Sequence, residues 1–404
     1  MKTLAVLVSH YPALSHTFIR REVAALRELG VRVQACSIHR ADASSLIAEA
    51  DRSEALRTIA VRPAAVGRTA SALAASLMGS RGVSEFAGAL AQGFEGGAKT
   101  RLHPVFYWAE AALLADALAS KQIGHIHAHF ANAGGEVALI ASRLLGASFS
   151  LTLHGHSDLE QTHPRRLAAL VSEASFVACV TDAMREAVAA RVPGSRNKLH
   201  VVRCGLDAEG LTPAARSAAP GANAQLRLLH VGRLSPEKNQ ALLLDAFVDA
   251  LAAGLDAELR IVGAGPDRDA LAKQISAPGL AGRAQLLGPL AGAALSAEYA
   301  AADVLVMSSR MEGLPVVLME ALAQGVPCIA PAVGGIPELI TGANGWLFPV
   351  GDRAALAACL TAASRERAGL AARGAAGRAA VLAAHDVRVN AAALRALFAP
   401  ALAE

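Results

Sequence analysis

Two glutamates frame a short turn in the second half of the chain. Glu312 is followed directly by Gly313, Leu314 and Pro315, and Glu320 lies eight positions beyond Glu312 among apolar residues. Pro315 suits the first turn of a helix, because proline has no N–H to lose there. We therefore expect the free backbone N–H groups of Gly313 and Leu314 to form an anion site at a helix N-terminus. Glu320 needs a partner, because an unpaired carboxylate in an apolar helix is costly.

Two cations, Arg233 and Lys238, follow the apolar run 226–231. At the carboxyl end of a strand, their side chains would neutralise a diphosphate. Two cations in a loop are by themselves ordinary surface charges. In combination with the anion site, they favour a nucleotide-diphosphate site.

Glycines occupy two further turns that follow apolar runs. Gly334 and Gly335 form one of them, and Gly263 begins the other. Glycine lets a backbone approach a ligand closely, although such pairs are also common in plain turns. The segment 262–266 lacks the third glycine of a dinucleotide-binding fingerprint, so it is only a weak indication of that site.

Histidines gather in the first half of the chain. His125, His127 and His129 alternate along the run 123–129, so they share one face of a strand, and His154 and His156 follow the run 149–153. One interpretation is a metal site. Because no cysteine or acidic loop completes a ligand set, we favour hydrogen-bonding or proton-handling histidines, with His154 foremost, and expect no metal.

Short apolar runs alternate with amphipathic stretches along the whole chain, which is typical of parallel α/β units. Strands are expected at 4–8, 31–36, 123–128, 149–153, 176–180, 199–202, 226–231, 258–262, 285–287, 304–307 and 326–330. Because these runs are continuously apolar, both faces of each sheet should be covered by helices. The pattern predicts two Rossmann-like, doubly wound domains that face a central cleft, with ligands at the carboxyl ends of the strands.

The expected division places an N-terminal domain at 1–205, with a helical insertion at about 42–105. A linker rich in Ala, Pro, Gly and Ser follows at 206–224. The C-terminal domain covers 225–385, and a final helix at 386–404 is expected to pack back on the N-terminal domain.

Composition excludes several classes of protein. The 404-residue chain has a net charge of only +4 and 4% aromatic residues, which argues against a nucleic-acid-binding protein. Its five scattered cysteines suit a reducing compartment. The apolar run after Met1 is short and has no cleavage site, and no apolar run is long enough to span a membrane. We therefore expect a cytoplasmic protein.

One segment, 55–84, contains four arginines and no acidic residue. It has two interpretations: an ordinary helical insertion with solvated arginines, or a contact surface for a lipid-phosphate substrate or for an anionic membrane at the inner face of the plasma membrane.

In this order, the motifs resemble those of retaining glycosyltransferases of family 4, which have the GT-B fold. Glu312 and Glu320 match the E-x7-E motif, and the segments 202–207, 231–233, 334–338 and 344–347 follow the expected order. The segments 11–19 and 152–156 resemble the branch that builds bacterial exopolysaccharides such as colanic acid. The resemblance covers nearly all of the chain except about 42–105.

The resemblance implies a role for each matching position. Arg233 and Lys238 would hold the diphosphate leaving group, Glu320 would accept the ribose hydroxyls, Glu312 would lie near the donor sugar, and His154 would contact the sugar at its reacting face. Gly334 and Gly335 would lie close to the sugar. The remaining expected donor-site residues are Gly263, Pro289, Gly313, Leu314 and Pro315, and those on the acceptor side are Ser15, Thr17, His129 and His156.

Two positions depart from the family pattern. Ser15-His16-Thr17 stands where many relatives have a Gly-Gly loop, and Cys204 replaces a common asparagine. The implied activity is metal-independent transfer, with retention, from a UDP- or GDP-linked sugar to a polysaccharide or lipid-linked acceptor, and no cofactor is implied. The alternatives are a nucleotide-sugar epimerase, or a nucleotide-sugar-binding protein without turnover.

Overall fold

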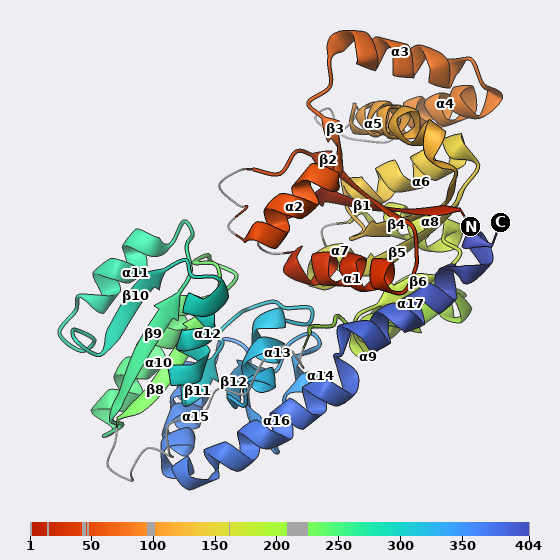
Figure 1. Ribbon diagram of the computed structural model, residues 1–404. Helices are drawn as coiled ribbons and strands as arrows, with labels where there is room; N and C mark the ends of the chain where they lie inside the picture. The colour runs from red at the N-terminus through yellow and green to blue at the C-terminus, as the bar shows by residue number, and fades with distance from the viewer. Residues whose placement is uncertain are drawn as a thin grey trace. The chain divides into compact units, whose positions relative to one another are not determined.

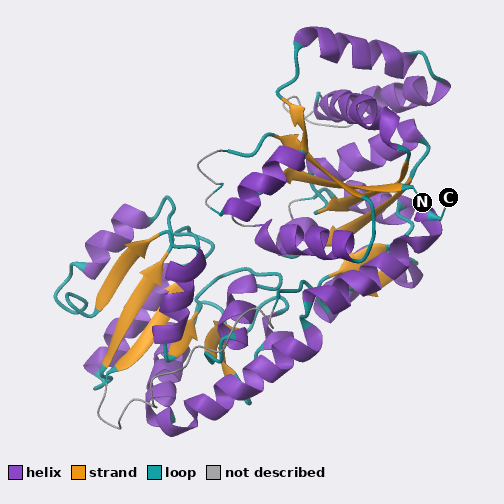
Figure 2. Ribbon diagram, in the orientation of Figure 1, coloured by secondary structure: helices purple, strands orange, loops and turns teal. Residues whose placement is uncertain are grey.

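The chain forms two compact units. The computed structural model describes residues 2–13, 16–42, 46, 48–94, 102–160, 162–207 and 225–403. Unit 1 comprises Met1–Arg203 and Val387–Glu404, and unit 2 comprises Cys204–Asp386. Each unit has one parallel sheet with helices on its faces (Figures 1 and 2), which confirms the expected pair of doubly wound α/β domains. Most of the expected linker, 206–224, lies outside the described residues.

Unit 1 has a seven-stranded sheet in the order β3-β2-β1-β4-β5-β6-β7. Its strands are β1 (Thr3–His10), β2 (Val33–His39), β3 (Ile59–Arg62), β4 (Ile123–His129), β5 (Ser148–Leu153), β6 (Val177–Cys179) and β7 (Leu199–Val201). Its helices are α1 (Thr17–Glu28), α2 (Glu49–Arg57), α3 (Val66–Leu77), α4 (Ser80–Phe94), α5 (His103–Leu118), α6 (Ala133–Leu145), α7 (His156–Glu160), α8 (Pro164–Glu173), α9 (Asp182–Arg191) and α17 (Val387–Leu402).

Side chains of β1 alternate between two cores. Leu4, Val6 and Val8 join the core beneath α1 and α17, whereas Ala5 and Leu7 join the core beneath α5 and α6. The alternation follows from the two-residue period of a strand. Both faces are therefore buried, as the continuous apolar runs predict.

The C-terminal helix α17 belongs to unit 1. It packs against α1, and the buried Phe398 contacts the ring of Phe176 with 5.4 Å between ring centroids. The N–H of Lys2 donates to the carbonyl oxygen of Leu402 at 3.2 Å. The two ends of the chain thus lie side by side (Figure 1).

Unit 2 has a six-stranded sheet in the order β10-β9-β8-β11-β12-β13. Its strands are β8 (Leu226–Val231), β9 (Ala257–Val262), β10 (Ala284–Gly288), β11 (Val304–Val306), β12 (Cys328–Pro331) and β13 (Gly345–Phe348). Its helices are α10 (Gln240–Ala252), α11 (Arg268–Ile275), α12 (Gly292–Ala301), α13 (Val316–Ala323), α14 (Ile336–Leu339), α15 (Arg353–Arg365) and α16 (Leu370–Ala384). Helices α10 and α15 pack together, and α13 packs against α16.

Two strands were not expected from the sequence, β3 and β13. Both are four residues long and both lie at sheet edges, so neither has the long apolar run that marks a central strand. The segment 42–105 is therefore not purely helical, because β3 extends the sheet between α2 and α3.

Two arginines of the basic segment 55–84 are paired with carboxylates of α5. Arg62 lies 2.9 Å from Glu110, and Arg68 lies 3.4 Å from Asp116. These ion pairs join β3 and α3 to α5. Among the described residues, no helix combines the length and the apolar character needed to cross a membrane.

Buried histidines run through the sheet of unit 1. Both ring nitrogens of His125 lie 2.6 Å from hydroxyls of β5, those of Ser148 and Ser150. Burial lowers the pKa of His125 to about 4. In unit 2, burial likewise lowers the pKa of His230 to about 4. Both side chains are therefore neutral in the native protein at pH 7.

We expect the stability of the protein to fall as the pH drops from about 6.5 to about 4. In this window the unfolded chain takes up protons on these histidines and the native chain does not, so stability rises with pH. Each such histidine contributes a slope approaching about 1.4 kcal/mol per pH unit. Urea unfolding at several pH values measures this slope. His125→Asn should reduce it, His103→Gln at an exposed position should not, and equal stability at pH 6.5 and 4.5 would contradict the assignment.

Candidate nucleotide-sugar site

The predicted donor-site residues follow the two strands between which the strand order of unit 2 reverses. Arg233 and Lys238 follow β8, and Glu312 follows β11, its neighbour in the sheet. In open α/β sheets, ligands bind at the carboxyl edge beside such a reversal, because the following helices lead away in opposite directions. The structure thus places these three residues after the two strands that flank the reversal.

Lys238 and Glu312 form an ion pair. Nζ of Lys238 lies 2.5 Å from Oε1 of Glu312, and the Glu312 side chain is only 9% exposed. The exposed Arg233 has no side-chain hydrogen bond or ion pair with any residue that the structure describes. Arg233 is therefore available to an incoming anion, whereas Lys238 must share its charge with Glu312.

A buried histidine holds the loop after β8. Nδ1 of His230 lies 2.9 Å from the carbonyl oxygen of Val306, and its Nε2 lies 3.1 Å from Nε2 of Gln240. Since the ring is neutral, Nδ1 donates to Val306 and Nε2 accepts from Gln240. The Gln240 amide also donates to the carbonyl oxygen of Arg233 at 2.8 Å. These bonds fix the backbone that carries Arg233.

The loop after β11 is tied directly to the loop after β8. The hydroxyl of Ser308 donates to the carbonyl oxygen of Lys238 at 3.0 Å. The N–H of Arg310 donates to the carbonyl oxygen of Glu237 at 2.8 Å. The guanidinium of Arg310 also donates to Oδ1 of Asn239 at 3.2 Å. The two loops therefore form one framework for the charged side chains.

The predicted glycines pack against backbone. Gly334 has a φ of +58°, and a Cβ there would lie 2.0 Å from the carbonyl oxygen of Glu312. The N–H of Gly335 donates to the carbonyl oxygen of Gly313 at 2.8 Å. A Cβ on Gly263 would lie 1.9 Å from a carbonyl oxygen of the loop after β8. Their contact with a sugar stays a prediction. Pro289 follows edge strand β10 and is exposed, away from the ion pair along the sheet.

Helix α13 begins one residue later than expected. Pro315 occupies the N-cap position with extended backbone, and Val316 is the first helical residue. Among the described residues, no acceptor is found for the N–H groups of Gly313, Leu314, Val316 and Val317. Together with the positive end of the helix dipole, these N–H groups suit an anion.

Glu320 lies within α13 and accepts a hydrogen bond from a neighbouring helix. The hydroxyl of the buried Tyr299 on α12 lies 3.3 Å from its Oε2. Tyr299 is thus one partner of the carboxylate that the apolar helix required, and the sequence did not reveal it. The side chain of Glu320 is half-buried and so remains partly accessible.

In unit 1, the structure brings two predicted histidines together. His129 ends β4 and His154 directly follows β5, and Nδ1 of His129 lies 2.9 Å from Nε2 of His154. The rings of Phe18 and Phe130 pack against the ring of His154, with 4.9 and 4.5 Å between ring centroids. Burial lowers the pKa of His154 well below its usual value. By contrast, His125 and His127 lie inside the sheet rather than at its edge.

The other acceptor-side candidates lie on nearby elements. Thr17 is the first residue of α1, and His156 is the first residue of α7. Ser15 lies outside the described residues.

Asp158 has a positioning role that sequence reasoning missed. Its Oδ2 accepts from the N–H groups of His154 and Gly155 at 2.7 and 3.1 Å, and its Oδ1 accepts from that of Ala131 at 2.7 Å. The carboxylate therefore joins the turns after β4 and β5. Burial raises the pKa of Asp158 to about 6, while the three donors act in the opposite direction.

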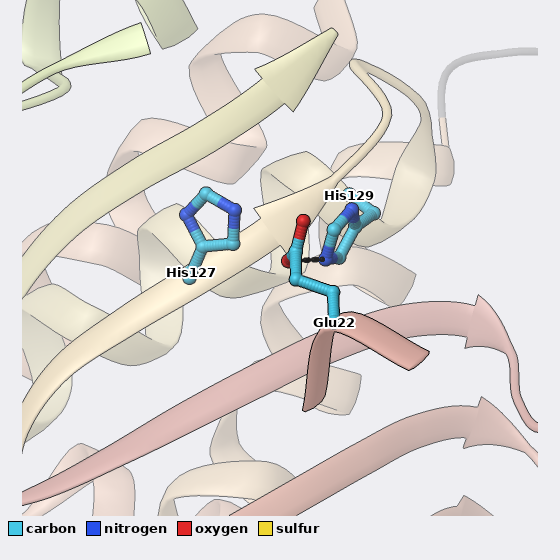
Figure 3. A group of neighbouring side chains, drawn as sticks. All are labelled: Glu22, His127 and His129. Carbon is cyan, nitrogen blue, oxygen red and sulfur yellow. Dashed lines mark ion pairs between the residues drawn. The ribbon is translucent and has the colours of Figure 1, made fainter. Parts of the chain in front are cut away.

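Glu22, His127 and His129 form the one group among the described residues that could hold a metal ion (Figure 3). Glu22 reaches from α1 to within 3.3 Å of Nε2 of His129. Both nitrogens of His127, however, are engaged by the hydroxyls of Ser150 and Thr152 at 2.7 and 2.8 Å. Two donors remain, fewer than zinc sites ordinarily use. The arrangement fits a series of polar contacts, from Glu22 to His129 and by a hydrogen bond from His129 to His154, better than a metal centre.

Comparisons with known proteins agree with this geometry. Residues 225–365 match the family model described as glycosyl transferases group 1, and residues 80–209 match that of glycosyltransferase family 4. In structure, the chain resembles the Anabaena protein HepE, solved in complex with UDP, with a TM-score of 0.74 and 20% identity over 99% of this chain and all of that one.

Curated relatives cover both units in part. A GDP-mannose-dependent alpha-(1-6)-phosphatidylinositol monomannoside mannosyltransferase of Mycobacterium tuberculosis is 32% identical over 61% of this chain and 69% of its own length. An amylovoran biosynthesis glycosyltransferase of Erwinia amylovora is 35% identical over 42% of this chain and 43% of its own length. The chain spans about a third to two thirds of the curated relatives it matches. On these matches, the chain belongs to glycosyltransferase family 4.

Proposed function

We propose that this protein is a retaining, metal-independent glycosyltransferase that moves a sugar from a UDP- or GDP-linked donor to a polysaccharide or lipid-linked oligosaccharide. The observation that carries the proposal is that Arg233, the Lys238–Glu312 pair and the beginning of α13 all follow two neighbouring strands of one sheet. The first N–H groups of α13 find no acceptor among the residues that the structure describes. The names of relatives support a nucleotide-sugar donor, since one is GDP-mannose-dependent and another was solved with UDP.

The diphosphate of the donor would lie across the loops after β8 and β11. Arg233 and Lys238 supply positive charge, and the N–H groups of Gly313, Leu314, Val316 and Val317 supply hydrogen-bond donors. As Lys238 turns to the diphosphate, it leaves Glu312 free to accept a hydroxyl of the sugar. Glu320, which accepts a hydrogen bond from Tyr299, would also accept hydrogen bonds from the ribose hydroxyls.

The chemical step needs charge stabilisation more than acid or base. The bond between the sugar C1 and the diphosphate oxygen breaks, and its electron pair goes to the diphosphate. The acceptor hydroxyl bonds to C1 on the same face, and its proton passes to the departing phosphate oxygen. Arg233, Lys238 and the N-terminus of α13 stabilise the negative charge that develops on the leaving group. In metal-dependent enzymes a divalent metal ion supplies this stabilisation. His154, fixed by His129 and Asp158, would contact the sugar, and unit 1 would bind the acceptor.

A cytoplasmic location belongs to the same proposal. None of the five cysteines, all of which the structure describes, forms a disulfide, which suits a reducing compartment. Nucleotide sugars as donors are consistent with that location.

Nucleotide binding is measured by thermal unfolding with UDP, GDP, ADP and their sugar conjugates. A ligand at 100 times its Kd stabilises the native state by about 2.7 kcal/mol, which raises Tm by several degrees. One nucleotide series should give this shift, and Glu320→Ala should weaken it. Asp269→Ala, which removes an exposed acid of the same unit, should leave the shift unchanged. No shift with any nucleotide would favour a protein that has lost its donor site.

Turnover with a nucleotide sugar and a glycan acceptor distinguishes the alternative activities. The product should keep the anomeric configuration of the donor when analysed by NMR, and EDTA should leave the rate unchanged. Arg233→Ala should lower kcat by about a hundredfold, because it removes a group that stabilises the leaving charge. Arg268→Ala, at an exposed position, is the matched control. An inverted product, or donor conversion without acceptor as in an epimerase, would contradict the proposal.

A peripheral membrane contact would involve α3 and α4. Val66 and Met78 are 87% and 89% exposed, and Arg57, Arg68 and Arg81 lie on the same segment. Exposed apolar and basic side chains together suit an anionic bilayer surface.

Vesicle co-sedimentation tests this contact, with phosphatidylcholine alone and with added phosphatidylglycerol. Replacing Arg57, Arg62, Arg68 and Arg81 by Ala should abolish the preference for the anionic vesicles. A control variant replaces the same number of exposed arginines elsewhere, Arg191, Arg196, Arg268 and Arg353. Equal binding by both variants would show that the segment does not contact lipid.

A further inference from the structure

Unit 1 contains a pocket that none of the candidate donor-site or acceptor-side residues lines. Its volume is about 560 Å³, and it lies at the carboxyl edge of the sheet, where β1, β2 and β3 end at His10, His39 and Arg62. Helix α5 forms its wall with Phe106 and Glu110. In Figure 1, α5 lies beside β3, and the two elements are in contact. Ligands of parallel sheets bind at this edge.

Aromatic and imidazole rings give the pocket flat apolar surfaces. Phe106 is 56% exposed, although a phenylalanine on a helix ordinarily faces the core. The rings of His10 and His39 stack with 4.6 Å between their centroids. Flat rings beside a few polar groups are typical of small-molecule pockets, and they suit the C–H face of a sugar ring.

Polar groups of the pocket retain capacity for hydrogen bonds. Nη1 of Arg62 lies 2.9 Å from Oε1 of Glu110, and the hydroxyl of Ser9 donates to Oδ1 of Asn132 at 3.0 Å. A guanidinium has five N–H donors and a carboxylate has about four acceptor positions. The pocket therefore offers both donors and acceptors to sugar hydroxyls.

The pocket has little net charge. Arg62 and Glu110 offset one another, and burial together with the neighbouring His39 lowers the pKa of His10, which keeps that ring neutral at pH 7. A phosphate or a uronate would bring a negative charge to a pocket whose arginine, Arg62, is already paired with Glu110. A neutral sugar brings no charge that would need a further cation.

The pocket extends from the end of β3 to Asn132 and Ala133, which follow β4, the strand next to β5. Its part at the end of β2 lies further from the turn after β5 that carries His154. In the order β2-β1-β4-β5, three strand spacings separate the end of β2 from that of β5, which is about 14 Å. This separation exceeds the width of one hexose ring. A sugar bound at the β2 and β3 end of the pocket, beside Phe106 and Arg62, would therefore not be the one that reacts beside His154.

We propose that this pocket is a distal acceptor subsite for a neutral hexose, so that the acceptor is a neutral oligosaccharide rather than a monosaccharide or a bare lipid phosphate. The inference rests on the proposed function, which supplies the acceptor. It assigns a binding role to Phe106, Glu110 and Arg62.

The test titrates the full chain with neutral glucose-, mannose- and galactose-based sugars of one to four residues, followed by saturation-transfer NMR and calorimetry. At least one trisaccharide should bind with a Kd of about 1 mM or tighter, and its monosaccharide should bind about tenfold more weakly. Phe106→Ala and Glu110→Gln should each weaken binding about tenfold, the scale of a lost ring contact or hydrogen bond. Leu102→Ala, an exposed apolar residue that does not line the pocket, should not.

Three results would overturn the subsite: no binding by any neutral sugar of the panel, binding of phosphorylated or uronate sugars only, or binding that Phe106→Ala and Glu110→Gln leave unchanged. The same samples are tested for stabilisation by nucleotides. Stabilisation without glycan binding would reject the subsite and leave the proposed function standing, whereas its absence would reject the proposed function itself.

Discussion

The reversal of strand order between β8 and β11 is the constraint on which the candidate donor site depends. Adjacent parallel strands end at the same edge, but the helices that follow them pack in different groups, α10 with α15 and α13 with α16. The two connecting loops are nevertheless tied together through Ser308, Arg310 and the Lys238–Glu312 ion pair. Joined loops above strands whose helices diverge form a charged edge of the sheet.

In the proposed donor complex, the ligand would replace a contact that already exists at this edge. Glu312 is nearly buried and would be costly there without Lys238. A diphosphate that takes over Lys238 exchanges one anionic partner for another, so the lysine never becomes an unpaired cation. Arg233 adds a cation that the described residues leave unengaged, and the beginning of α13 adds N–H donors. Binding then needs little reorganisation of the loops themselves.

Unit 1 handles its polar side chains differently. Its histidines lie in the sheet, where His125 and His127 contact the hydroxyls of β5 and burial lowers their pKa values. At the strand end, Glu22 contacts His129, and His129 contacts His154. Asp158 fixes the same turn by accepting three backbone N–H groups. The turn that carries His154 is therefore held from both sides.

Local pattern in the sequence was sufficient to predict the alternation of strands and helices, and with it the placement of Arg233, Lys238, Glu312 and Glu320 after strands of one sheet. These features depend on residues near one another in the chain, through strand and helix periods and the chemistry of turns.

Tertiary structure alone decided which distant residues meet. Glu22 reaches His129 and Tyr299 reaches Glu320 only because separate helices pack on the sheet. Short edge strands such as β3 and β13 form because a neighbouring strand offers hydrogen bonds, and their own residues give little indication of it. The tight spacing at Gly334 likewise comes from the carbonyl of Glu312 on another loop. Contacts between segments far apart in sequence are set by packing, and packing has no signature in a local run of residues.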